Sequence, residues 1–397
     1  TWHSPNFKEL QAITAHFVDA SNTRQKALLS LPELRNGHAG VEVAAQIMTT
    51  LEAYGITDRL GYITADNHGA NDTMCTELER QLPTPWQAEQ RRLRCVGHII
   101  NIAVQAFFFA KDKEAVDLAI QESQRSDASI DDELSQLYQK SDDDGGFIKV
   151  TPLQKILSLC THLRRSDRQY NTFKRLAGKV IRSPNDTRWN SYLNTFEDAL
   201  QLRTQYTSFC SDNDKDECHL TASEWHLVQQ TIDFLQPFKE ATKRCEGDNV
   251  TLDKVQVIMD ALSAHFKEQQ SLHRANTSFT ESIITSWYAF DKYYILIDQT
   301  GAYSAAILLH PSHRKSYLQT AWKKDWVSHG VDRARVIWQQ YKDNDTSIDS
   351  IDTTTMTQYE RYCYEIQQRQ QRTKGASDEF ERFINSPAIA INTPALN

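Results

Sequence analysis

The chain has 397 residues, 40% hydrophobic and 24% charged, which suits one large globular domain or two ordinary ones. Its 13 glycines and 10 prolines disfavour an all-β fold rich in tight turns, and no apolar stretch approaches the roughly 20 residues of a transmembrane helix. A formal net charge of −8 argues weakly against nucleic acid as a partner of the chain as a whole.

The first 111 residues predict an α/β segment. Residues 10–19 alternate apolar and polar side chains, which predicts a strand, and residues 25–34 predict an antiparallel partner after a polar turn. Apolar residues at helical spacing predict a helix over 38–55, ended by Gly55. The expected order then continues with a strand at 59–66, a helix at 69–82, a brief strand at 91–95 and an apolar helix at 95–111.

The charge then changes sign along the chain. Residues 111–146 carry 4 basic and 11 acidic residues, whereas residues 149–190 carry 10 basic and 2 acidic. We expect 112–148 to be a solvated, partly disordered linker and the basic segment to attract phosphate. After Lys149 the apolar spacing predicts an almost entirely helical chain, with helices at 151–165, 188–206, 222–238, 252–266, 281–297, 304–309 and 334–343.

The stretch "ITADNHGAND", residues 63–72, places Asp66 between a predicted strand and a predicted helix. A carboxylate at a strand tip suits a divalent metal such as Mg²⁺, which takes one or two carboxylates with water and phosphate oxygens. The alternative is that Asp66 or Asn67 makes a turn or caps the helix that begins near Gly69. Spacing alone leaves both interpretations open.

Cys95 and His98 are three residues apart on one predicted helix face. A structural zinc site needs four ligands, and the distant "ECHL" at 217–220 could supply the other two. The alternative is a buried cysteine and a hydrogen-bonded histidine near a strand tip.

The segment 163–190 interleaves basic and aromatic residues. Arg164, Arg165, Lys174 and Arg188 could bind phosphates, and Trp189 could stack on an unpaired base. The alternative is a solvated helix face, with a helix N-terminus near Arg188 and Trp189 buried beneath it.

Several stretches, in this order, resemble the hAT superfamily of transposases, most closely its fungal and plant members. They are "TWHSPN", "AITAHFVD", "GHAGVEVA", "ITADNHGAND", "RCVGHIINIAVQ", "NDTRWNSYLNTFEDAL", "LLHPSHRKSYL" and "SDEFERFINSP". No single motif is specific, but their order is hard to obtain by chance, and the resemblance spans nearly the whole chain.

The resemblance implies an RNase H-like α/β core, a mixed sheet with flanking helices, interrupted by a large all-helical insertion. It divides the chain into a core at 1–111, a linker at 112–148, a helical insertion at 149–376 and the start of a dimerisation region at 377–397. It also implies DNA transposition by a triad of two Asp and one Glu holding Mg²⁺ or Mn²⁺. Asp66 would be the second carboxylate and a metal ligand, Cys95 and His98 would match a structural pair near the site, and Arg188 and Trp189 would match a DNA-contacting pair.

Three departures from the family pattern bear on activity. The first Asp of the family's D-x-W pattern would precede Thr1, the final Glu would follow Asn397, and the N-terminal zinc finger is not within this sequence. Glu360 and Glu365 lack the family's surroundings for the final Glu. With one of three carboxylates, we expect this chain to be inactive in strand cleavage. The alternative function is a non-catalytic scaffold that binds nucleic acid or protein. A third possibility, a metal-dependent nuclease unrelated to transposition, would need the same first Asp.

The 7 cysteines are scattered without a C-x-x-C pair, which indicates reduced thiols, and no signal peptide is readable. Together with the resemblance, this predicts a nuclear protein with DNA as partner and no membrane association. Homo-oligomers are common in the family, so we expect one for the full-length form.

Overall fold

The computed structural model describes residues 2–3, 9–34, 39–83, 85–109, 151–184, 189–247, 250–344, 357–358, 361–362 and 378–390. The chain divides into two compact units, one made of residues 1–15, 27–250 and 258–296, the other of residues 16–26, 251–257 and 297–397. The four domain ranges expected from the sequence stay predictions. The acidic linker at 112–148 lies outside the described residues, as do Glu360 and Glu365.

The described strands are short and pair two by two. β1 (Trp2–His3) pairs with β2 (Glu9–Leu10), β3 (Ile13–Val18) with β4 (Arg24–Ser30), and β5 (Ile63–Ala65) with β6 (Arg92–Arg94). β1 and β2 run antiparallel, whereas β5 and β6 run parallel. The mixture of strands and helices was expected. The described strands do not form the single mixed sheet that was also expected, because each strand pairs with only one other strand. An RNase H-like core therefore stays an inference.

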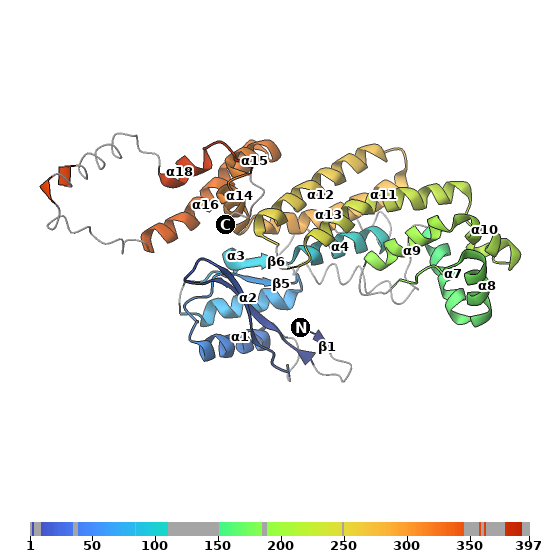
Figure 1. Cartoon of the computed structure of the whole chain (residues 1–397), viewed down its shortest axis with the longest axis horizontal. Helices are drawn as coiled ribbons and strands as arrows, with labels where there is room; N and C mark the ends of the chain where they lie inside the picture. Colours follow the sequence, from blue (N-terminus) through green and yellow to red (C-terminus); the bar gives the residue numbers. More distant parts are fainter. Residues whose placement is uncertain are drawn as a thin grey trace. The chain divides into compact units, whose positions relative to one another are not determined.

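Helices α1 (Gly40–Tyr54) and α2 (Gly69–Gln81) lie side by side in the first unit (Figure 1). Gly40 permits their close approach, since a Cβ at this position would lie 2.3 Å from the Ala70 carbonyl oxygen. Gly55 ends α1 in the left-handed conformation with φ 63°, as the sequence predicts. The core between the helices contains Val43, Ala44, Met48, Leu51, Met74, Cys75 and Leu78.

After α3 (Ala88–Arg91) and β6 comes helix α4 (Val96–Phe109), which packs against later helices of the same unit. The Phe107 ring stacks on Phe234 with ring centroids 4.7 Å apart and meets Phe279 edge-on at 5.7 Å. Ser286 donates a hydrogen bond of 2.7 Å from Oγ to the Ala103 carbonyl oxygen. Aromatic packing therefore fixes α4 against α11 (Ala222–Arg244) and α13 (Thr277–Ile297).

The later helices follow the predicted pattern with corrected boundaries. Their bounds are α7 (Thr151–Arg165), α8 (Asp167–Ala177), α9 (Asn190–Gln201), α10 (Arg203–Asp212), the 3₁₀ helix η1 (Asp216–Cys218), α11 (Ala222–Arg244), α12 (Leu252–Leu272) and α13 (Thr277–Ile297). The single helix predicted over 188–206 is wrong, because the chain breaks at Leu202 into α9 and α10. α11 continues through Pro237, since Phe234, Phe238 and Ala241 are buried on both sides of it and outweigh the lost backbone hydrogen bond.

In the second unit, α14 (Ala302–Leu309), α15 (Arg314–Ala321), α16 (Lys324–Asn344) and α18 (Glu379–Ile384) share one apolar core. Its most buried members include Ile307, Leu308, Leu318 and Ile384. α15 was not expected from the sequence, and α16 begins at Lys324 rather than at 334. No described helix combines the length and the apolar character needed to cross a bilayer.

Candidate functional site

Asp66 lies directly after β5, at the carboxyl end of the parallel β5–β6 pair, and its side chain is exposed. Its Oδ1 accepts hydrogen bonds from the His68 backbone N–H at 3.1 Å and from Asn71 Nδ2 at 2.6 Å. The N-cap of α2 is His68, whose Nδ1 accepts from the Ala70 N–H at 3.2 Å. The carboxylate thus orders the turn into α2, as the capping interpretation requires, while the described residues leave its Oδ2 open.

Two buried or nearly buried arginines approach the same strand tip. Arg92 donates from its guanidinium to the Asp66 carbonyl oxygen at 3.2 Å and forms an ion pair with Asp72, which Arg94 also reaches at 3.5 Å. Among the described residues, no group of three or more His, Cys, Asp or Glu side chains at metal-ligand spacing includes Asp66. A two-metal site needs more carboxylate than this. The residues that are described therefore do not fit such a site by themselves.

The neighbouring Asn67 is 1% exposed and donates from Nδ2 to the Cys95 carbonyl oxygen at 3.2 Å. The Cys95 N–H donates in turn to the Ala65 carbonyl oxygen at 3.1 Å, which extends the β5–β6 ladder by one residue. Cys95 and His98 are half-buried at the start of α4. Within the described chain, the ligand group that contains Cys218 is completed by His162 and Glu217, not by Cys95 and His98. The four-ligand zinc site considered from the sequence is therefore not assembled.

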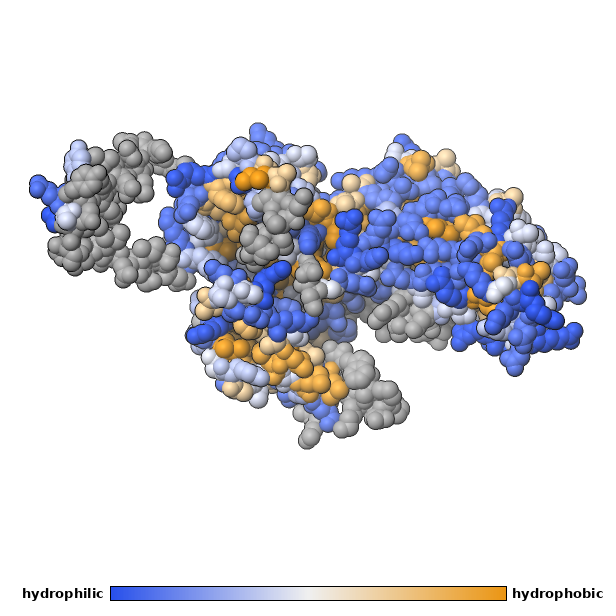
Figure 2. Space-filling model, viewed as in Figure 1, coloured by the Kyte–Doolittle hydropathy of each residue, from blue (hydrophilic) through white to orange (hydrophobic). Residues whose placement is uncertain are grey.

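The exposed basic side chains gather on α7 and α8, which meet at Ser166. Arg164 and Arg165 end α7, and Lys174 lies in the last turn of α8. All three are exposed, and none takes part in an ion pair within the part of the chain that the structure describes. Arg168 and Arg175 on α8 are exposed as well and extend the cluster. The surface over α8 is mostly hydrophilic (Figure 2).

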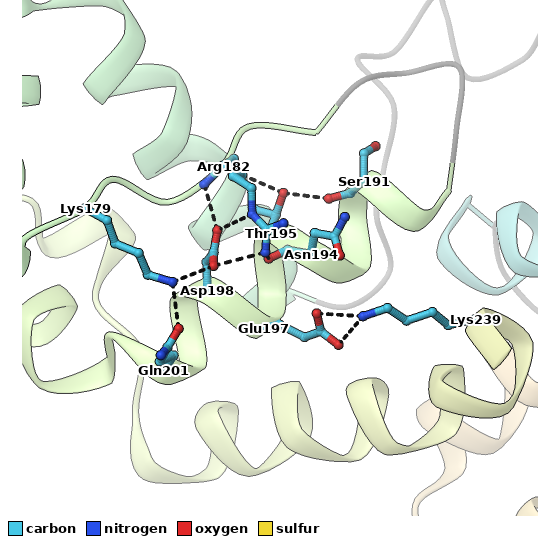
Figure 3. A network of polar contacts seen from close by, with 9 residues as sticks. All are labelled: Lys179, Arg182, Ser191, Asn194, Thr195, Glu197, Asp198, Gln201 and Lys239. Atoms are coloured by element: carbon cyan, nitrogen blue, oxygen red, sulfur yellow. Dashed lines mark hydrogen bonds and ion pairs between the residues drawn. The ribbon is translucent and has the colours of Figure 1, made fainter. Parts of the chain in front are cut away.

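Other cations of the basic segment form internal ion pairs (Figure 3). Lys179 Nζ lies 2.9 Å from Asp198 Oδ1, and Arg182 Nε lies 2.7 Å from Asp198 Oδ2. Asp198 is buried, which by itself raises its pKa, but hydrogen bonds from Arg182 and Lys179 hold the pKa below its ordinary value. Lys155 pairs with Glu224 at 2.7 Å. The charge excess seen in the sequence is therefore partly structural, and among the described cations of this segment, those without an ion pair lie on α7 and α8.

The aromatic residues of the basic segment are mostly buried. Phe173 is fully buried and packs edge-on against Phe209, and Trp189 is 4% exposed. Tyr170 is 39% exposed and lies one helical turn from Lys174. Arg188 lies outside the described residues. In this structure Tyr170, rather than Trp189, offers a free ring face beside the basic cluster.

Sequence reasoning missed two groups of side chains at metal-ligand spacing, His162 with Glu217 and Cys218, and Asp253 with His310 and His313. The H-x-x-H spacing inside "LLHPSHRKSYL" was a readable signal for the second group. Asp253 gave no signal, because it is more than fifty residues away in sequence and approaches the histidines only through the fold.

Comparison with known proteins places these features in context. Residues 1–92 match the family model for the ZBED1 RNase-like domain. A Talaromyces stipitatus protein provisionally named transcriptional regulator tpeD is 22% identical over 342 residues, covering 82% of this chain and 36% of its own length. A Zea mays protein provisionally named AC transposase is 21% identical over 429 residues, covering 98% of this chain and 47% of its own length.

The chain thus spans less than half the length of the curated relatives it matches. These similarities, at low identity, relate the chain to hAT-like transposases and support the interpretation that it is a hAT-derived protein.

Proposed function

We propose that this chain is a DNA-binding protein derived from a hAT-type transposase, and that it contacts the phosphate backbone through the α7–α8 basic cluster, defined as Arg164, Arg165, Arg168, Lys174 and Arg175. The observation that carries the proposal is the exposure of these cations without internal ion pairs in the described chain. Nuclear residence follows from this function, and assembly into a homo-oligomer is proposed for a longer form.

The cluster suits a phosphate backbone in charge and position. Arg164 and Arg165 lie at the carboxyl end of α7, and α8 begins immediately beyond Ser166. The cations of the cluster therefore come from two consecutive helices. Each cation that neutralises a phosphate releases a condensed counterion, which favours binding without reading the base sequence. Tyr170 adds a ring that can stack on an exposed base.

A binding assay tests this function. We expect duplex DNA to bind the wild-type chain and to bind the charge-reversal variant Arg164→Glu/Arg165→Glu/Lys174→Glu at least about tenfold more weakly, since each lost phosphate contact reduces affinity. Fluorescence anisotropy with a labelled oligonucleotide measures both. Lys243→Glu/Arg244→Glu is the matched control, because these exposed cations also lie in the last turn of a helix, α11. Equal loss in test and control variants would contradict the proposed surface.

The second candidate function is metal-dependent strand cleavage, and the specific observation in its favour is the exposed Asp66 carboxylate at the end of a parallel strand pair. We propose Asp66 as one ligand of Mg²⁺ or Mn²⁺ in a complete catalytic centre, with the remaining carboxylates supplied from outside the described residues. The metal would activate water and stabilise a leaving oxygen. Cys95, whose N–H is bonded to Ala65, would hold the strand tip in place.

Because no group of three or more possible metal ligands among the described residues includes Asp66, we expect the purified chain not to nick supercoiled DNA in Mg²⁺ or Mn²⁺. Nicking by this chain that is abolished in Asp66→Ala would overturn that expectation and make it an enzyme. If the chain neither binds nor cuts DNA, the remaining candidate function is the non-catalytic scaffold for protein.

A further inference from the structure

A side-chain cluster in the second unit includes neither Asp66 nor any residue of the α7–α8 basic cluster, which belong to the first unit. Asp253 comes from the first turn of α12, while His310 ends α14 and His313 begins α15. The ligand atoms of the three side chains all lie within 4.8 Å of one another, and His310 Nε2 is 4.0 Å from Asp253 Oδ2. The two imidazole rings are neighbours, with centroids 4.5 Å apart.

From this geometry we propose that Asp253, His310 and His313 form a binding site for a divalent transition metal of the zinc type. Two imidazoles and one carboxylate are a ligand set that zinc accepts, with a fourth position left for water. The side chains are mostly shielded, since Asp253 is 8% exposed and both histidines are half-buried. A metal in this position would tie the start of α12 to the turn between α14 and α15.

The turn that carries the histidines is held firmly. Arg314 follows His313 with φ 53°, an unusual conformation for a residue with a side chain, and it is 6% exposed. Its guanidinium donates to the Pro387 carbonyl oxygen at 2.8 Å and lies over the Phe383 ring at 4.7 Å. The Ile389 N–H donates to the Pro311 carbonyl oxygen at 2.9 Å. These contacts hold the turn in place, and within it the His313 N–H donates to the His310 carbonyl oxygen at 3.0 Å, which brings the two histidines together.

Binding requires only small adjustments. Ligand atoms around one zinc with bonds of about 2.0 Å lie roughly 3.3 Å apart, so atoms that now lie up to 4.8 Å apart must close by up to about 1.5 Å, which side-chain rotation can provide. His310 Nδ1 accepts from the Ser312 N–H at 3.2 Å, so binding through Nε2 moves the ring proton to Nδ1 and gives up that long hydrogen bond.

Cobalt provides a direct test, because Co²⁺ bound by nitrogen and oxygen ligands absorbs visible light. We expect the purified full chain to bind one equivalent of Co²⁺ that Zn²⁺ displaces. The near-isosteric variants Asp253→Asn and His313→Gln should each weaken binding by more than about tenfold, at least the loss that follows from removing an outer partner of a metal ligand. Circular dichroism establishes that each variant is folded. Two variants are used so that, if one fails to fold, the other still tests whether these side chains bind the metal.

Two control variants locate the metal. His329→Ala removes an exposed histidine of α16 in the same unit, and His162→Ala disrupts the other ligand group. Both should retain the cobalt spectrum. The proposal is overturned if the wild-type chain binds no Co²⁺, if folded Asp253→Asn and His313→Gln bind it as tightly as the wild type, or if His162→Ala alone abolishes binding.

Discussion

Replacing Asp198 by alanine tests the structural basis of the basic segment. Asp198 is 4% exposed and accepts four hydrogen bonds, from Lys179 Nζ at 2.9 Å and from the backbone N–H, Nε and Nη2 of Arg182 at 3.2, 2.7 and 3.1 Å (Figure 3). These bonds attach the chain after α8 to α9. Without the carboxylate, the attachment loses its acceptor at every one of those contacts.

The magnitude follows from what happens to each donor. The side chains of Lys179 and Arg182 are 45% and 58% exposed, so they can turn to water after the substitution. The Arg182 N–H is less free to do so, and an unpaired backbone donor costs about 1–3 kcal/mol. Adding the net value of the charge-assisted bonds, we expect Asp198→Ala to destabilise α9 by about 2–4 kcal/mol.

The adjacent Glu197 is the matched control. It lies on the same helix and pairs with Lys239 at 2.8 Å, but its side chain is 27% exposed. Glu197→Ala should therefore cost only about 0.2–1 kcal/mol, the range of solvent-exposed ion pairs. Hydrogen exchange of the α9 amides, followed by mass spectrometry, measures both variants. Exchange in Asp198→Ala that is no faster than in Glu197→Ala would refute the reasoning.

Three further predictions follow from the described contacts. Although burial raises the pKa of Asp198, its hydrogen bonds lower the pKa further, so that it lies below the ordinary value in the folded state. The carboxylate should therefore stabilise the fold fully at neutral pH, and this stabilisation should be lost as the pH falls below about 4 and through the lowered pKa. Acid titration of the wild type and of Asp198→Ala compares the two. Burial raises the pKa of the Cys160 and Cys210 thiols to about 12, so site-resolved alkylation at pH 8 should label half-buried Cys95 before these two, and the reverse order would be contrary evidence. Gly40→Ala should lower the stability of the α1–α2 pair by about 1–3 kcal/mol, because its Cβ would overlap the Ala70 carbonyl. Thermal unfolding measures this change, and a midpoint equal to that of the wild type would show that the helices separate without cost.

Local features of the fold were predictable because they depend on neighbouring residues. The apolar spacing of α7 and the glycine that ends α1 gave correct boundaries. α8 was missed because only Phe173 of its side chains is fully buried, so its apolar pattern is weak in a strongly charged stretch. The helix predicted over 222–238 was too short, because packing on both sides of Pro237 carries α11 on to Arg244.

The candidate sites were less predictable because they depend on contacts between distant segments. Asp66 could be placed at a strand tip from the sequence, but the proximity of Arg92 and its pairing with Asp72 could not. The excess charge of 149–190 was visible, yet the pairing of Arg182 with a buried carboxylate on α9 was not. Tertiary structure alone separates the cations that stabilise the fold from those available to a ligand.

The most direct test of the central claim is the salt dependence of DNA affinity in the wild-type chain, in Arg164→Glu/Arg165→Glu/Lys174→Glu and in the control Lys243→Glu/Arg244→Glu. Each phosphate contact contributes about 0.9 to the slope of log affinity against log salt concentration, so the triple variant should have a slope smaller by about 2.7, with the control slope unchanged. Equal slopes in all three proteins would show that DNA does not contact the α7–α8 basic cluster and would contradict the proposed function.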